Sequence, residues 1–88
     1  MTGPTLAWQV YIVRCADGTL YTGVTTDLTR RVHEHNTSKR GAAYTRTRRP
    51  VSLVYAAPAI NRSAACVEEC HIKKLTRAEK LKLCRESR

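Results

Sequence analysis

Aromatic and β-branched residues gather in three short runs that predict strands. The first run, WQVYIVR, covers residues 8–14 and the second, LYTGVTT, covers residues 20–26. Between them ADGT (16–19) contains Asp-Gly, the strongest short signal for a β-hairpin. The third run, VSLVYAA, covers residues 51–57, and we expect Pro58 to end it.

Between the second and third runs the pattern predicts a helix and then a loop. Asp27 is a good N-cap for a helix over residues 28–36, with Leu28 and Val32 on one side. The segment 36–50 has no regular period, and we expect a basic loop there that holds at most one short helical turn.

Two more helices are predicted after the third run. The first starts at Asn61 or Ser63 and continues to about Leu75. The second covers residues 77–86 and follows TRAE (76–79), which has the sequence of a capping box.

This order of elements predicts a single α+β domain over residues 1–88, in which helices flank a small three-stranded antiparallel sheet. A chain of this length buries only about 60–65% of its unfolded surface. The sequence has no Phe and one Trp, so Val, Ile, Leu, Ala and tyrosine rings must form a modest core. We therefore expect the chemistry on an open face.

Charge points to a polyanionic partner. Lys and Arg number 16 against 7 Asp and Glu, a formal net charge of +9. The arginines concentrate in TRR (29–31) and TRTRRP (45–50), and Arg suits phosphate better than Lys does, so nucleic acid is the favoured partner. A solvated basic surface without a partner is the alternative.

The sequence contains no recognisable membrane signal. No charged segment followed by an apolar run opens the chain, and no stretch approaches the ~20 apolar residues of a membrane span. We also find no basic amphipathic helix suited to a membrane surface. The expectation is a soluble, cytoplasmic protein without a signal peptide.

The four cysteines allow two interpretations. Cys66 and Cys70 are four residues apart on a predicted helix and His71 follows, while Cys15 lies in a strand and Cys84 in the last helix. A structural zinc site is one interpretation. Small apolar fillers in a reducing compartment are the other, and the lack of a C-x-x-C pair favours them.

The tripeptides VYI (10–12) and YTG (21–23) resemble the two halves of the GIY-YIG nuclease signature. The segments YTGVTTDLTRRVHEHN and RSAACVEECHIKKLTRAEK are similar to the small stand-alone GIY-YIG proteins of bacteria. This resemblance covers about residues 8–83. It implies the fold predicted above, in the order β-β-α-β-α-α, and a nuclease activity.

The resemblance implies five catalytic residues: Tyr11, Tyr21, Arg31, His35 and Glu69. It implies that Tyr11 helps to take a proton from the attacking water, and that Tyr21 orients this water or the phosphate. Arg31 would clamp the scissile phosphate, and His35 would donate to phosphate or share in proton transfer. Each residue also has a structural alternative: the tyrosines as sheet residues, Arg31 and His35 as surface residues.

Glu69 is the implied metal ligand, because Ala-x-x-x-Glu-x-x-Ile-Lys fits Ala65, Glu69, Ile72 and Lys73. Helical periodicity instead leans toward Glu68, and we follow the motif. A single carboxylate suits Mg²⁺ or Mn²⁺, since Mg²⁺ keeps several waters and takes other ligands from substrate phosphate. The alternative for Glu69 is an ion pair with Lys73, four residues later on a helix.

Two departures from the family pattern are visible. The first tripeptide is VYI rather than GIY, with Val10 and Ile12 around the tyrosine, a small change. Val24 stands where related repair nucleases carry a lysine, and Arg30 or a basic residue of the loop would fill that role.

Other residues are expected to contact nucleic acid. Gly23 would let a substrate approach the backbone, and Asn36 belongs to the HN ending of the resembled subgroup. The loop would guide phosphates, with one tyrosine stacking on a base. The loop residues are Lys39, Arg40, Tyr44, Arg46, Arg48 and Arg49.

The function expected from the sequence is a metal-dependent DNA endonuclease with a one-metal mechanism. Single-stranded, damaged or branched DNA is the expected substrate, with a role in DNA repair. We expect a monomer or weak homodimer, with an unknown protein partner as one possible source of targeting. The alternative is a non-catalytic DNA- or RNA-binding module that keeps the nuclease fold.

Overall fold

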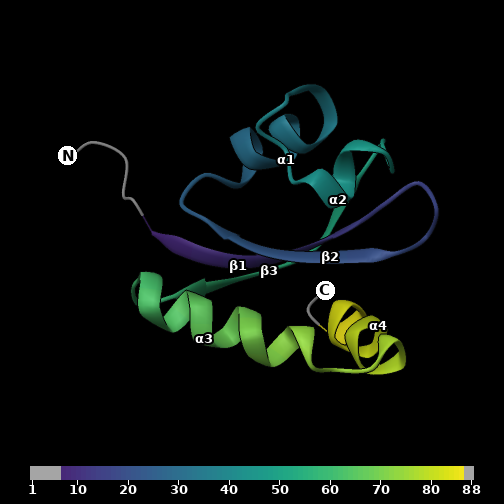
Figure 1. The fold of residues 1–88 in the computed structure, drawn as a ribbon. Coiled ribbons are helices and arrows are strands. Elements are labelled where there is room, and N and C mark those ends of the chain that lie inside the picture. Colours follow the sequence, from purple (N-terminus) through teal and green to yellow (C-terminus); the bar gives the residue numbers. More distant parts are fainter. Residues whose placement is uncertain (1–6, 87–88) are drawn as a thin grey trace.

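A three-stranded antiparallel sheet separates two pairs of helices in the computed structural model, which describes residues 7–86 (Figure 1). The helices α1 and α2 lie on one face of the sheet, and α3 and α4 lie on the other. This α+β architecture confirms the predicted fold class. The elements are β1 (Trp8–Arg14), β2 (Leu20–Thr25), α1 (Leu28–Thr37), α2 (Ala43–Arg46), β3 (Ser52–Ala59), α3 (Arg62–Lys73) and α4 (Arg77–Glu86).

The first strand lies at the centre of the sheet, because the strand order is β2-β1-β3. Helices cover both faces of β1, which is why its four consecutive residues 10–13 are all apolar and buried. Val10 and Ile12 pack with Ile72 of α3 on one face. Tyr11 and Val13 belong to a second cluster on the other face. The side chain of Tyr11 is therefore on the same side of the sheet as α1.

Local signals placed the hairpin turn and the start of α1 correctly, whereas α1 ends one residue later and α3 two residues earlier than predicted. Gly18 has a φ of +85° in the hairpin, and the Asp17 carboxylate accepts hydrogen bonds from the backbone N–H and the hydroxyl of Thr19. Asp27 caps α1 by accepting from the N–H of Arg30. The short helix α2 is the single turn expected in the basic loop.

The caps of the last two helices also follow from sequence. Asn61 rather than Ser63 caps α3, since its side chain accepts from the N–H of Ala64. The predicted capping box is present. The N–H of Thr76 donates to the Glu79 carboxylate, and the N–H of Glu79 donates to the Thr76 hydroxyl.

The prediction that Pro58 ends the third strand is wrong. The strand β3 continues to Ala59, and Pro58 pairs with Gln9 of β1. The reason is that β3 is an edge strand. A proline is tolerated there because the missing N–H can face solvent instead of a neighbouring strand.

The longest helix, α3, has 12 residues. Among residues 7–86, none of the helices is both long and apolar enough to cross a membrane.

Candidate active site

Tyr11 and Gly23 are directly opposite each other on β1 and β2. The Tyr11 ring is 1% exposed, and a Cβ atom added to Gly23 would lie 2.5 Å from the Tyr11 hydroxyl oxygen. Tyr11 therefore fills the space that Gly23 leaves open. This corrects the expectation that nucleic acid approaches the backbone at Gly23, because the missing side chain accommodates the phenol instead.

Tyr21 lies on the same face as Tyr11, two residue pairs further along the hairpin, opposite Val13. Its ring meets the His35 ring edge-on, with centroids 5.4 Å apart and planes at 69°. Its other neighbour is Tyr44, stacked at 5.9 Å. The structure thus brings together, against α1, the two tyrosines that the resemblance implied as catalytic residues.

His35 connects Tyr11 to the loop. It is fully buried at 0% exposure, with Nε2 2.7 Å from the Tyr11 oxygen and Nδ1 2.9 Å from Thr45 Oγ1. The Thr45 hydroxyl donates to the carbonyl of Ala42, so it accepts from Nδ1–H of His35. The Nε2 atom is then the acceptor, and the Tyr11 hydroxyl donates to it.

Burial, supported by the nearby positive charge of Arg31, lowers the pKa of His35 from 6.5 to about 4. The ring is therefore neutral at pH 7. Because it is fully buried and both ring nitrogens have partners, His35 cannot donate directly to phosphate. This corrects one of its two expected roles and leaves the other, a share in proton transfer through Tyr11.

Arg31 presents its guanidinium to the same site from α1. Its Nη1 atom donates to Glu34 Oε1 at 3.0 Å and to the carbonyl of Arg40 at 2.8 Å. Burial raises the pKa of Tyr11, and a hydrogen bond with Arg31 opposes that rise. Arg31 is thus fixed beside the Tyr11 hydroxyl, with other N–H groups left for a ligand.

Glu69 approaches this site from α3. Its negative charge contributes to the raised pKa of Tyr11, whereas the charge of Glu68 acts on Tyr55. Geometry supports Glu69, because Lys73 contacts its carboxylate and lies 6.0 Å from the centre of the Tyr21 ring, although the helical pattern leaned toward Glu68. Glu69 also forms an ion pair with Lys73, whose Nζ lies 3.1 Å from Oε2.

The donor set fits an ion that keeps much of its own water. Glu69 is 22% exposed, so a cation on its carboxylate would remain open to solvent and substrate. Within the described residues, no group of three or more His, Cys, Asp or Glu side chains could hold a metal. A single carboxylate suits Mg²⁺ or Mn²⁺, which take further ligands from water and phosphate.

Two residues expected to contact nucleic acid hold the backbone instead. Asn36 exchanges two hydrogen bonds with the backbone of Val51, at 3.0 and 2.7 Å. Arg49 donates to the carbonyls of His35 and Ser38, near the C-terminal end of α1. Both roles are structural, and we withdraw these residues from the nucleic-acid surface.

Arg48 and Tyr44 are also engaged within the protein. The guanidinium of Arg48 lies 4.0 Å from the centre of the Tyr44 ring and forms a 3.1 Å ion pair with Asp17. Tyr21 stacks on Tyr44 as well, so both contacts occupy the ring on which a base was expected to stack. In the basic loop, the exposed cations are Lys39, Arg40 and Arg46.

Sequence reasoning missed two residues of the site. Thr45 is buried at 0% exposure and fixes the tautomer of His35, but it lies in a segment without any regular period. Glu34 orients Arg31, and its place three residues later on the same helix was a usable signal.

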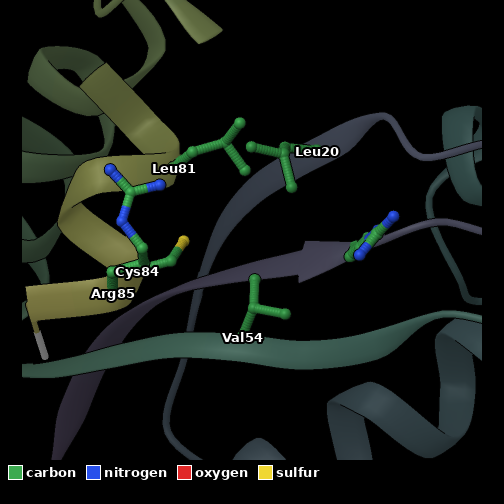
Figure 2. A pocket seen from close by; sticks show the side chains of 6 residues that line it. Leu20, Val54, Leu81, Cys84 and Arg85 are labelled. Carbon is green, nitrogen blue, oxygen red and sulfur yellow. The ribbon is translucent and has the colours of Figure 1, made fainter. Parts of the chain in front are cut away.

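A separate cavity of about 200 Å³ lies on the opposite face of the sheet, between α4 and the strands (Figure 2). Leu20, Val54, Leu81 and Cys84 form its apolar wall, and Arg14 and Arg85 complete the lining. None of these residues carries a carboxylate or imidazole, so this cavity does not offer the groups for hydrolysis.

Comparison with known proteins identifies the family. The model of the GIY-YIG catalytic domain matches residues 7–82. A UPF0213 protein from Desulfotalea psychrophila is 56% identical over 81 residues, covering 92% of this chain and 74% of that protein. A UPF0213 protein from Staphylococcus epidermidis is 51% identical over 77 residues, covering 88% of this chain and 93% of that protein.

Solved structures agree with this comparison. The solution NMR structure of a UPF0213 protein from Bacillus halodurans is 42% identical with a TM-score of 0.55, covering 88% of this chain and 81% of that one. The solution NMR structure of a protein from E. faecalis is 35% identical with a TM-score of 0.59, covering 93% and 88%. Membership of this family supports a function of the nuclease type. The chain belongs to the GIY-YIG catalytic domain family.

Proposed function

We propose that this protein is an endonuclease that hydrolyses phosphodiester bonds in DNA and uses one divalent ion, Mg²⁺ or Mn²⁺, on Glu69. One observation carries the proposal: the Tyr11 hydroxyl is held between His35 and Arg31, with the Glu69 charge acting on it. A merely structural tyrosine that is buried in a sheet needs one hydrogen-bond partner for its hydroxyl, not three polar groups around it.

Tyr11 is suited to accept a proton from water. Its own hydrogen points to Nε2 of His35, and one lone pair of its oxygen accepts from Arg31, so the other lone pair is left to accept from water. Because burial raises the pKa of Tyr11, the phenolate is not its resting form. A relay avoids the phenolate: water gives a proton to the Tyr11 oxygen while the Tyr11 proton moves to His35.

Neutral His35 is the partner that this relay needs, since a protonated ring would have no acceptor at Nε2. The hydroxide formed from water attacks phosphorus, and the bond from phosphorus to the 3′-oxygen breaks. Arg31 would donate to the phosphoryl oxygens, where negative charge increases in the transition state. Tyr21, fixed by His35 and Tyr44, would orient the water or the phosphate.

A divalent ion held by Glu69 would offset the charge that develops on the departing oxygen. The exposed cations Lys39, Arg40 and Arg46 would hold neighbouring phosphates, consistent with the net charge of +9.

A cleavage screen tests the proposal. Labelled single-stranded, nicked, forked and duplex DNA, with matched RNA, is incubated with Mg²⁺, Mn²⁺ or EDTA. We expect the wild-type protein to cleave at least one DNA substrate. EDTA should abolish this cleavage, and Glu69→Gln should not show it. Tight binding of all substrates without any cleavage would contradict the proposal and favour a non-catalytic binding module.

A further inference from the structure

Lys73 is bound to the carboxylate on which the proposed function places the metal. It follows Glu69 by one helical turn in α3, and its Nζ lies 3.1 Å from Glu69 Oε2. The same ammonium is 6.0 Å from the centre of the Tyr21 ring. Lys73 therefore lies beside two residues to which the proposed function assigns roles, Glu69 and Tyr21.

The ammonium can leave this carboxylate easily. The Lys73 side chain is 51% exposed, so water can solvate its charge in another rotamer. An exposed ion pair between residues four apart on a helix is weak, and salt screens it further. The contact is therefore strong enough to occupy Glu69 in the resting protein and weak enough to be exchanged.

A divalent cation cannot share Glu69 with Lys73 without cost. A metal bound to the carboxylate would lie within a few ångströms of the ammonium, and like charges at that distance repel each other. Among the described carboxylates, Glu69 is also the one whose charge acts on Tyr11, and its ion-pair partner Lys73 lies beside Tyr21. Binding of the metal must then move Lys73.

A DNA phosphate would offer the displaced ammonium a new partner next to Tyr21. Resting on the proposed function, we propose that Lys73 and the divalent ion compete for Glu69, and that DNA relieves this competition by binding Lys73. Metal and DNA then bind cooperatively, because each favours the arrangement in which Lys73 has left Glu69.

Direct titration of Mn²⁺, followed by the electron paramagnetic resonance of the free ion, tests the competition without DNA and without turnover. We expect Lys73→Met to bind Mn²⁺ about two- to fivefold more tightly than the wild type, the range expected for loss of an exposed ion pair. Lys74→Met is the matched control, since it removes the same charge from an exposed neighbour, the C-cap residue of α3.

The controls separate the possible failures. Equal Mn²⁺ affinities for Lys73→Met and Lys74→Met would overturn the competition while leaving the metal site intact. Unchanged Mn²⁺ binding in Glu69→Gln would overturn both the competition and the proposed metal ligand. Circular dichroism checks that every variant keeps its helices.

A second titration tests the cooperativity. Both proteins in this titration carry Tyr11→Phe, which slows cleavage, and one of them also carries Lys73→Met. We expect a bound single-stranded oligonucleotide to tighten Mn²⁺ binding more in the protein that retains Lys73. An equal effect of the oligonucleotide in both proteins would overturn the coupling.

Discussion

Position 23, opposite Tyr11 in the hairpin, has room only for glycine. A Cβ atom there would lie 2.5 Å from the Tyr11 hydroxyl oxygen and 2.7 Å from its Cζ. We predict that Gly23→Ala shifts the ring away from His35. Such overpacking costs about 1–3 kcal/mol of stability. Cleavage should fall with it, as measured by urea unfolding beside single-turnover kinetics. Unchanged stability and unchanged cleavage together would show that the close approach has no consequence.

The buried His35 makes stability depend on pH. Its pKa falls from 6.5 to about 4 on folding, so the unfolded chain binds the proton more readily. The neutral His35 ring therefore contributes about 3 kcal/mol to the free energy of unfolding. This contribution is complete above pH 6.5 and is lost as the pH falls toward 4. Urea unfolding at several pH values should show this loss in the wild type, and His35→Gln should lose less stability over the same range. Parallel pH profiles for both proteins would contradict a buried neutral His35.

The basic loop contains arginines with different roles. Arg49 donates to backbone carbonyls near the end of α1, and hydrogen bonds from charged groups contribute about 1.5–3 kcal/mol each. We predict that Arg49→Ala destabilises the protein by about 2–4 kcal/mol on the same principle. Arg46→Ala, at an exposed position in the same loop, should leave thermal stability nearly unchanged. Equal effects on melting would contradict the structural role of Arg49.

Lys39, Arg40 and Arg46 are the loop cations available for phosphate. Their combined replacement by Ala should reduce the slope of log K against log salt by roughly two to three, because each phosphate contact contributes about 0.7 on single strands or 0.9 on duplex DNA. Fluorescence anisotropy at several salt concentrations measures this slope. An unchanged slope would place the DNA-binding surface elsewhere on the protein.

Adjacent glutamates give a matched pair for the metal site. The charge of Glu69 acts on Tyr11, whereas the charge of Glu68 acts on Tyr55, which packs on the opposite face of the sheet. We predict that Glu69→Gln abolishes metal-dependent cleavage and retains DNA binding, while Glu68→Gln has little effect on either. Cleavage and anisotropy assays on both variants check this, and the reverse result would move the proposed ligand by one residue.

The elements that the sequence predicted well depend on neighbouring residues. The Asp-Gly turn and the caps at Asp27 and Asn61 act within three residues, so local chemistry determines them. The end of β3 does not follow the same logic. Whether Pro58 interrupts a strand depends on whether that strand lies at an edge, which only the assembled sheet decides.

The site residues that belong to a motif could be predicted from the sequence. The roles of polar side chains that bind distant backbone groups could not. Arg31 and Glu69, which the motif orders with Tyr11, both act on the pKa of its hydroxyl. Arg49 and Asn36 resemble phosphate ligands in sequence, yet they satisfy backbone groups 11 to 15 positions away. Charge and composition do not distinguish these two uses of a polar side chain.

Single-turnover cleavage by Tyr11→Phe, in the presence of Mg²⁺ or Mn²⁺, tests the central claim most directly. The substitution removes one oxygen and preserves the ring that fills the space at Gly23. Tyr55→Phe, on the opposite face, is the control. We predict a rate loss of about 10²- to 10⁴-fold for Tyr11→Phe, the range for lost proton-transfer groups, with DNA affinity retained and Tyr55→Phe fully active. A Tyr11→Phe protein that cleaves at the wild-type rate would contradict the proposed role of the Tyr11 hydroxyl.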